Sequence, residues 1–339
     1  MKTRNTYLDI VKGITITLVV FAHCIQFGSG QEALHHGAHF ENWLFKLIYT
    51  FHMPVFMLIS GYLFFFSLRR HTYSENLSLR FTHLLLPVLI WQSLWIIVEH
   101  FLNWGMYPTI YSIISSYTCE LWFLVSLFVN STLILIIYHK FNSSKRIYLL
   151  FALFPLTLTI PFHQSTSLTI FMFPYFIIGY YFNKLNISKL FAPRDRKSLL
   201  LIVFLLLCFI FMYNHYNTEH YVYTTGTSII SNHRISIERI IIVLFRWIIG
   251  FVGSALFLLI VWWVHQLISL KLFTYLGTTS LGIYIISTYI FKLFYILPQI
   301  ISSNLLINTL QCIIVLVISW SCSKLLSRHS LTKKLFLGG

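Results

Sequence analysis

The 339-residue chain is 57% hydrophobic and only 10% charged, whereas about a quarter of the residues in an ordinary soluble domain are charged. Its mean hydropathy of +0.76 and its recurrent apolar runs of about 17 to 25 residues exclude a soluble globular protein and indicate membrane-spanning helices. The net charge of +15 does not indicate nucleic-acid binding, because the basic residues lie in short segments between the apolar runs. We therefore predict an all-α, polytopic integral membrane protein.

About ten apolar segments are expected to cross the membrane as helices, because a helix satisfies its own backbone hydrogen bonds in lipid. The fifth and sixth segments are short and are interrupted by Pro155, Pro161 and Pro174, so they could instead be broken or re-entrant pieces. In chain order the predicted spans are 8–27, 44–66, 81–102, 121–139, 148–163, 167–183, 199–214, 240–265, 273–296 and 305–325.

Basic residues between the spans predict the orientation of the chain. If the N-terminus is cytoplasmic, the even-numbered connections and the C-terminal tail hold most of the interspan Lys and Arg residues. The positive-inside rule then predicts that the chain crosses the membrane several times and that both termini are cytoplasmic. No connection is long enough to bury a core of its own. We expect residues 1–339 to form a single transmembrane domain with no separate soluble domain, surrounded by membrane lipids.

Two ionisable residues share one face of the first span. Lys12 and His23 are eleven residues apart, which is three helical turns plus roughly 20° and about 16 Å along the axis. Asp9, Thr15 and Gln26 fall on the same polar stripe. Because ionisable groups are costly to bury in the bilayer, the stripe predicts a functional path. The structural alternative is that Lys12 pairs with Asp9 and snorkels to the inner interface, while His23 only hydrogen-bonds a neighbouring helix.

A second histidine lies near the start of the second span, within the tetrapeptide FHMP at 51–54. The span begins at the outer face, so His52 is expected at a depth comparable with that of His23. Two imidazoles at matching depth can act as a base and as a substrate-orienting group, since imidazole titrates near neutrality. The alternative is that Pro54 kinks the helix, that His52 satisfies the freed carbonyls, and that Ser60–Gly61 serves close helix packing.

Four ordered motifs resemble those of the membrane-bound acyltransferase-3 family, and they cover most of the chain. They are DIVKG at 9–13, followed by His23 eleven residues after its lysine; FHMPVFMLISGYLF at 51–64; LWFL at 121–124; and LGTTSLGIY at 276–284. The chain departs from the family pattern before the third span. It reads RFTH at 80–83, where many members have two arginines in an R-x-x-R pattern.

The resemblance implies an integral-membrane O-acyltransferase, which moves an acyl group, commonly acetyl, from acyl-coenzyme A to a hydroxyl outside the cytoplasm. It also implies that His23 is essential and that Lys12 is its basic partner. An alcohol attacks a thioester readily only when a base accepts its proton, and a neutral histidine suits that role. We predict His23 as the general base, with Lys12, Asp9 and His52 as further catalytic residues.

Acetyl-CoA, or another acyl-CoA, is the predicted donor substrate, and no permanently bound cofactor is expected. Its phosphate groups need cationic partners at the cytoplasmic face, and the predicted ones are Lys12, Arg69, Arg70 and Arg80. Lysine at position 12 keeps the charge of an arginine but lacks its bidentate fork. The alternative for the three arginines is that they set the topology and meet anionic lipid.

The predicted acceptor is a cell-envelope glycan such as O-antigen, capsule or exopolysaccharide, or a lipid-linked oligosaccharide precursor. Its predicted contacts are Glu120, Trp122, Tyr62 and Ser60, although Glu120 could instead be solvated at the outer interface. A multispan transporter or exporter of polysaccharide or lipid-linked glycan is the alternative function, because intramembrane polar residues are expected there too.

No metal site is predicted. The five cysteines lack C-x-x-C spacing. Three histidines form an H-H-x-x-H pattern at 35–39, but no acidic pattern accompanies them, and the segment is expected to be a solvated loop.

Overall fold

The structure is a computed structural model that describes residues 5–28, 38–102, 110–141, 164–183, 196–217, 220, 230–231, 234–296 and 304–339. Within these ranges the chain is helical apart from turns and one short antiparallel hairpin, in which β1 (Ile230–Ser231) pairs with β2 (Arg234–Ile235). Seven of the described helices are long and apolar enough to cross a membrane. The predicted all-α, polytopic membrane fold is therefore confirmed.

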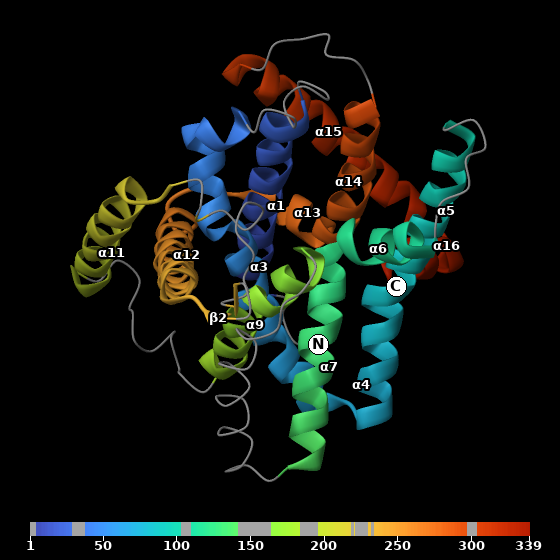
Figure 1. The fold of residues 1–339 in the computed structure, drawn as a ribbon, viewed down its shortest axis with the longest axis horizontal. Helices are drawn as coiled ribbons and strands as arrows, with labels where there is room; N and C mark the ends of the chain where they lie inside the picture. The colour runs from blue at the N-terminus through green and yellow to red at the C-terminus, as the bar shows by residue number, and fades with distance from the viewer. Residues whose placement is uncertain are drawn as a thin grey trace. The chain divides into compact units, whose positions relative to one another are not determined.

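Figure 1 shows the helices along the chain. They are α1 (Thr6–Phe27), the 3₁₀ turn η1 (Ala38–Glu41), α3 (Trp43–Arg70), α4 (Tyr73–Arg80), the π-helical turn η2 (Phe81–Leu85), α5 (Leu86–Leu102), α6 (Ile110–Cys119), α7 (Trp122–Lys140), α9 (Gln164–Phe182), α11 (Arg196–Asn214), α12 (Ile237–Val264), α13 (Lys271–Thr278), α14 (Ser280–Ile296), α15 (Leu305–Leu326) and α16 (Ser330–Leu337).

Every predicted span that falls within the described residues contains an apolar helix. The third span begins earlier than predicted, because the helical stretch Tyr73–Phe101 runs through α4, η2 and α5 without a break. The helix α9 continues through Pro174. The alternative that the sixth span is broken at this proline is therefore wrong. The predicted span 148–163 lies outside the described residues.

The prediction of one helix over 273–296 is wrong, because α13 ends at Thr278 and α14 begins at Ser280. Between them Thr279 leaves the helical conformation, with φ −113° and ψ 11°. The hydroxyls of Thr278 and Thr279 lie 2.8 and 3.2 Å from the carbonyl oxygen of Tyr275. Ser and Thr side chains that bond nearby backbone groups compete with regular helix. The polar interruption in an otherwise apolar segment explains the break.

Local capping sets two other helix starts. The Asn5 side chain accepts a hydrogen bond from the Leu8 amide at 3.3 Å, which caps α1. Thr72 and Glu75 form a reciprocal capping box at the start of α4. Each side chain satisfies an amide that the helix itself leaves without an acceptor.

The chain divides into two compact units. The first unit comprises 1–56, 184–224 and 242–325, and the second comprises 57–183, 225–241 and 326–339. The helix α3 contributes its first part to the first unit and the remainder to the second. The single domain expected over 1–339 stays a prediction.

In the first unit, α1 packs along α13 and α14 (Figure 1). In the second unit, α7 packs on α4 and α9, and α16 packs on α5. The second part of α3 approaches α9 closely. A methyl group on Gly61 would collide with the carbonyl oxygen of Phe176, and one on Gly179 would collide with that of Leu58. The expectation of close packing at Ser60–Gly61 is confirmed for Gly61, since only a glycine admits such backbone contact.

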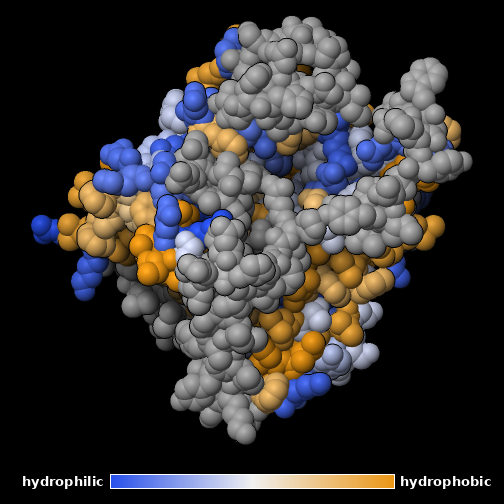
Figure 2. Space-filling view, in the orientation of Figure 1, coloured by the Kyte–Doolittle hydropathy of each residue, from blue (hydrophilic) through white to orange (hydrophobic). Residues whose placement is uncertain are grey.

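Hydrophobic side chains are exposed on the described surface, and Figure 2 shows them in orange on one face. Among the seven described helices that could cross a membrane, α11 is the most exposed, since only 11% of its apolar window is buried. Its large outward side chains include Leu200, Phe204, Leu207 and Phe211. Such a continuous apolar surface on a long helix is expected where the helix faces lipid.

Candidate active site

The helix α1 holds the polar stripe predicted from the sequence. Asp9, Thr15 and Gln26 are buried, so the stripe faces the interior of the first unit. Lys12 Nζ lies 2.8 Å from the Asp9 carboxylate, and 22% of the Lys12 side chain is exposed. The ion pair expected in the structural alternative is therefore present. The ion pair fixes the position of the Lys12 ammonium group, while part of the side chain stays exposed.

The short helix α13 holds α1 at the level of this ion pair. A methyl group on Gly277 would collide with the carbonyl oxygen of Asp9, and one on Gly13 would collide with that of Phe273. Two glycines from motifs that are far apart in the sequence thus let two backbones touch. Gly13 belongs to the DIVKG motif and Gly277 to the LGTTSLGIY motif. Each motif therefore supplies the small residue that allows the backbone of the other helix to approach.

His23 lies one turn before the end of α1, among aromatic rings. Its imidazole meets Phe27 at 5.6 Å and Phe291 of α14 at 5.4 Å between ring centroids, both edge-on. Its Nδ1 atom is buried and has no hydrogen-bond partner among the described residues. The alternative in which His23 hydrogen-bonds a neighbouring helix finds no support at this atom. A buried polar atom without a partner is a candidate contact for a substrate, since leaving it unpaired is costly.

His52 is buried in the first part of α3, with 3% of its surface exposed. Its Nδ1 lies 2.7 Å from the Ile48 carbonyl oxygen. Because a carbonyl only accepts, we assign the proton to Nδ1, which leaves Nε2 as the acceptor of the neutral ring. The carbonyl that Pro54 deprives of its helical donor is that of Thr50, so His52 does not bond the freed group. His52 and His23 both belong to the first unit.

A hydrogen bond that sequence reasoning missed links the helices of the two histidines. The Tyr49 hydroxyl donates to Gln26 Oε1 at 3.0 Å, and the Tyr49 ring meets the His52 ring edge-on at 4.7 Å. Tyr49 is one helical turn before His52, and Gln26 is nearly one turn after His23. The helical spacing of four polar or aromatic residues on two spans was the signal that could have found this connection.

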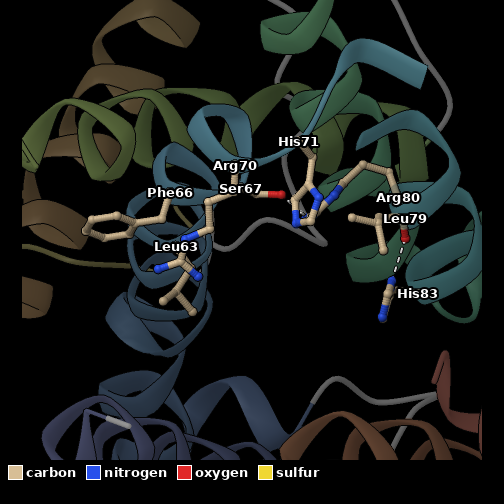
Figure 3. A pocket seen from close by; sticks show the side chains of 8 residues that line it. All are labelled: Leu63, Phe66, Ser67, Arg70, His71, Leu79, Arg80 and His83. Carbon is tan, nitrogen blue, oxygen red and sulfur yellow. Dashed lines mark hydrogen bonds between the residues drawn. The ribbon is translucent and has the colours of Figure 1, made fainter. Parts of the chain in front are cut away.

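The second unit contains a basic pocket where α3 ends and α4 and η2 follow, shown in Figure 3. The cavity measures about 460 Å³. Two arginines and two histidines face it, together with Ser67 and three apolar side chains, and none of the described residues that line it is acidic. The lining residues are Leu63, Phe66, Ser67, Arg70, His71, Leu79, Arg80 and His83. A pocket with this composition favours an anionic ligand.

Arg80 is held in this pocket by a polar network. Its Nη2 donates to Ser67 Oγ at 3.2 Å, and Ser67 donates to Asn76 Oδ1 at 2.7 Å. Asn76 is fully buried and also donates to the His71 and Thr72 carbonyl oxygens. The network orients the guanidinium before any ligand binds.

Of the four residues predicted to contact the donor, only two line this pocket. Arg70 and Arg80 line the pocket, whereas the exposed Arg69 lies over the Phe65 ring at 4.3 Å and is not among the lining residues. Lys12 lies in the first unit. Arg70 and Arg80 are the two predicted cations that the structure brings together.

The predicted acceptor contacts lie on two parts of the second unit. Glu120 is in the turn between α6 and α7, and Trp122 is the first residue of α7. Ser60 and Tyr62 flank Gly61 on α3, where the Tyr62 carbonyl accepts a hydrogen bond from Asn183 at 2.8 Å. All four side chains are partly buried. Their role as substrate contacts stays a prediction.

The predicted solvated loop at 35–39 is wrong for its last histidine. His39 is 5% exposed and packs on the rings of Phe40 and Phe45; His35 and His36 lie outside the described residues. The aromatic neighbours give the imidazole an apolar surface to bury against, which a count of polar residues in the loop does not reveal.

Sequence reasoning also missed a buried arginine, Arg246, which is 3% exposed within α12. Burial raises the pKa of Tyr216, which follows α11, to about 12, and the positive charge of Arg246 acts in the opposite direction. An ionisable residue inside a predicted span was the signal that could have singled out Arg246.

These features define a multi-pass membrane protein whose first unit holds a histidine on each of two helices joined by a hydrogen bond, and whose second unit holds a basic pocket. The acyltransferase domain family (Acyl_transf_3) matches residues 5–324. The chain therefore belongs to this family, and the predicted class, an acyltransferase, is confirmed at the level of the family.

Two curated relatives are named as nodulation proteins. The chain is 32% identical over 194 residues to nodulation protein NolL of Mesorhizobium japonicum, covering 53% of this chain and 48% of the relative. It is 30% identical over 214 residues to nodulation protein NolL of Sinorhizobium fredii, covering 58% and 54%. The chain thus spans about half the length of the curated relatives it matches. No solved structure matches it.

Proposed function

We propose that this protein transfers an acyl group, most simply acetyl, from cytoplasmic acyl-CoA to a hydroxyl of a cell-envelope glycan such as O-antigen, capsule or exopolysaccharide, or of its lipid-linked precursor. His23 is the general base, and the protein resides in the bacterial cytoplasmic membrane. The observation that carries the proposal is the buried Nδ1 of His23, which has no hydrogen-bond partner among the described residues. Membership of the acyltransferase family supplies the reaction class.

The reaction requires one proton acceptor. The glycan hydroxyl oxygen attacks the thioester carbonyl carbon, and its proton passes to His23. The carbon–sulfur bond then breaks, and the departing CoA thiolate takes up that proton. A histidine is neutral enough near pH 7 to accept the proton and acidic enough to return it. His52, whose tautomer is set by Ile48, orients the acceptor hydroxyl.

The basic pocket of the second unit supports acyl-CoA as the donor. CoA carries a diphosphate and a phosphate monoester, and guanidinium groups bind such oxygens with two parallel hydrogen bonds. Arg70 and Arg80 face the pocket, and Arg80 Nε is buried without a hydrogen-bond partner among the described residues. These contacts support acyl-CoA as the proposed donor substrate, and the proposal includes no permanently bound cofactor.

Replacing His23 with alanine tests the proposed base. General base catalysis contributes roughly 10²- to 10⁴-fold to the rate, so glycan acylation should become undetectable while the variant still inserts into the membrane. Mass spectrometry of the surface glycan measures the acyl content. The matched control is His215→Ala, because His215 is an exposed histidine of the same unit and its loss should change nothing.

Full acylation in the His23→Ala strain would contradict the proposal. The exporter alternative predicts a different phenotype, with glycan retained inside the cell and its acyl content unchanged. Cell fractionation with glycan quantification therefore separates the two functions.

A paired arginine experiment tests the donor. Arg80→Ala should raise the KM for acyl-CoA by about tenfold or more, since it removes charged hydrogen bonds of roughly 1.5 to 3 kcal/mol. Arg69→Ala is the matched control, because Arg69 covers the Phe65 ring outside the pocket lining. Equal KM values for the two variants, in membranes assayed with acetyl-CoA, would refute the assignment of the pocket.

A further inference from the structure

The C-terminal helix α16 lies beyond residues 5–324, which the family match covers. It packs against η2 and α5 within the second unit, so a segment outside the family domain reaches the helical turn that lines the basic pocket. The inference drawn from this contact rests on the proposed function, in which that pocket binds acyl-CoA.

Two contacts attach α16 to its surroundings. Trp91 Nε1 donates to the Phe336 carbonyl oxygen at 2.9 Å, and the two rings meet edge-on at 5.6 Å. At the other end, the Thr332 hydroxyl donates to the Leu326 carbonyl oxygen at 2.7 Å. The helix is thereby fixed at both ends.

The end of α16 lies directly against His83. Gly338 has a φ of +78° and caps the helix in the left-handed backbone conformation. Residues that have a side chain rarely adopt this conformation. A methyl group on Gly338 would lie 2.5 Å from the His83 carbonyl oxygen. One on Gly339 would lie 3.4 Å from His83 Nε2. Glycine at position 338 therefore lets the chain reach the backbone of His83, and Gly339 lies beside the ring edge at ordinary van der Waals distance.

The backbone of His83 is open to this approach because of the residue four positions later. Pro87 has no N–H, so the His83 carbonyl lacks the donor that a regular helix would supply. The π-helical turn η2, in which the Leu86 amide bonds the Phe81 carbonyl, accommodates the proline. Such turns are frequent at functional sites.

One ring nitrogen of His83 is hydrogen-bonded to the backbone, and the other can contact a ligand. Its Nδ1 lies 2.7 Å from the Leu79 carbonyl oxygen and therefore carries a proton, as the dashed line in Figure 3 shows. Nε2 remains for a ligand, in a pocket that Arg70, His71 and Arg80 also line. His83 is the position at which the sequence departs from an R-x-x-R pattern.

We propose that α16 is a structural part of the donor pocket, because its Gly338–Gly339 end holds His83 where Nε2 binds a phosphate group of CoA. His83 in its protonated form donates from Nε2 to a phosphate oxygen. α16 acts through His83, so its residues are positioning residues for donor binding and not for the chemical step.

The test measures the affinity of the purified full-length protein for coenzyme A by isothermal titration calorimetry in detergent micelles. Gly338→Leu displaces His83 and should weaken CoA binding about tenfold, as His83→Ala should, the effect of one lost hydrogen bond to a charged group. The matched control is Leu331→Ala, because Leu331 of α16 is 66% exposed and its truncation should leave the affinity unchanged. In transfer assays, Gly338→Leu should raise the KM for acyl-CoA and leave kcat unchanged.

A second variant guards against misfolding. Trp91→Phe keeps a ring but removes the hydrogen bond to Phe336, and it should weaken CoA binding by about threefold to tenfold at an unchanged melting temperature. If both Gly338→Leu and Trp91→Phe bind CoA as the wild type does while His83→Ala does not, the role of α16 is overturned and the donor pocket stands. If the wild type itself does not bind CoA, the proposed donor fails, and this inference fails with it.

Discussion

The ion pair between Asp9 and Lys12 offers a direct test of how the first unit holds its polar stripe. The two side chains meet at 2.8 Å, with exposed fractions of 5% for Asp9 and 22% for Lys12. At that distance the Coulomb attraction is about 6 kcal/mol for an effective dielectric constant of about 20, and the cost of removing both charges from water offsets much of it. Breaking a buried pair costs roughly 3 to 5 kcal/mol, because the remaining charge is left uncompensated.

We expect Asp9→Asn to lower the free energy of unfolding by about 3 kcal/mol, the lower end of that range, because Lys12 keeps some contact with solvent or headgroups. Lys12→Met in the Asp9→Asn background should recover about 2 kcal/mol, since it removes the uncompensated charge. Denaturant titration of the detergent-solubilised protein, arranged as a double-mutant cycle, measures both values. The coupling should change little between low and high salt, because a buried pair is weakly screened.

The interpretation is refuted if Asp9→Asn alters the free energy of unfolding by less than about 0.5 kcal/mol, the range typical of surface substitutions. Additivity of the two single substitutions would refute it as well. In either case the contact would be a solvated pair, and the close approach of α13 would have to stabilise α1 by packing alone.

Two further predictions concern packing and the histidine pair. Gly61→Leu should lower the free energy of unfolding of the second unit by about 1 to 3 kcal/mol or more, because the leucine side chain would overlap the α9 backbone at Phe176. Thermal melting measures this loss, and an unchanged melting temperature would contradict the α3–α9 contact. Tyr49→Phe removes the hydrogen bond to Gln26, worth about 1 kcal/mol, and should lower kcat without changing the affinity for CoA. An unchanged kcat in transfer assays would show that this bond does not position the histidines.

Much of the fold followed from local sequence patterns. A run of apolar residues long enough to cross the hydrocarbon layer predicts a helix wherever it occurs, and the helices α1, α3, α7, α11, α12 and α15 lie where such runs were found. The helical period alone placed Asp9, Lys12 and Gln26 on one stripe, and the structure buries Asp9 and Gln26. The break at Thr279 was missed, because hydropathy averages over a window and four residues of the segment Gly277–Ser280 hardly change the mean.

The candidate site could be predicted only in part. His23, Lys12 and Arg80 were found through motif spacing and charge, which are properties of neighbouring residues in the chain. The exclusion of Arg69 from the pocket depends on where its side chain turns, since Arg69 and Arg70 are adjacent and chemically identical. Arg246 was passed over because, apart from Lys12 in the first span, basic residues were considered only between the spans.

What the sequence by itself determined was therefore the helical membrane class, the spans, and the residue types available to chemistry, because helical period and hydropathy are local. Which groups meet was decided by the tertiary structure. Gly13 meets Phe273 and Gly338 meets His83, each pair separated by more than two hundred residues. Contacts of this kind depend on the matching of two surfaces, and neither surface alone specifies its partner.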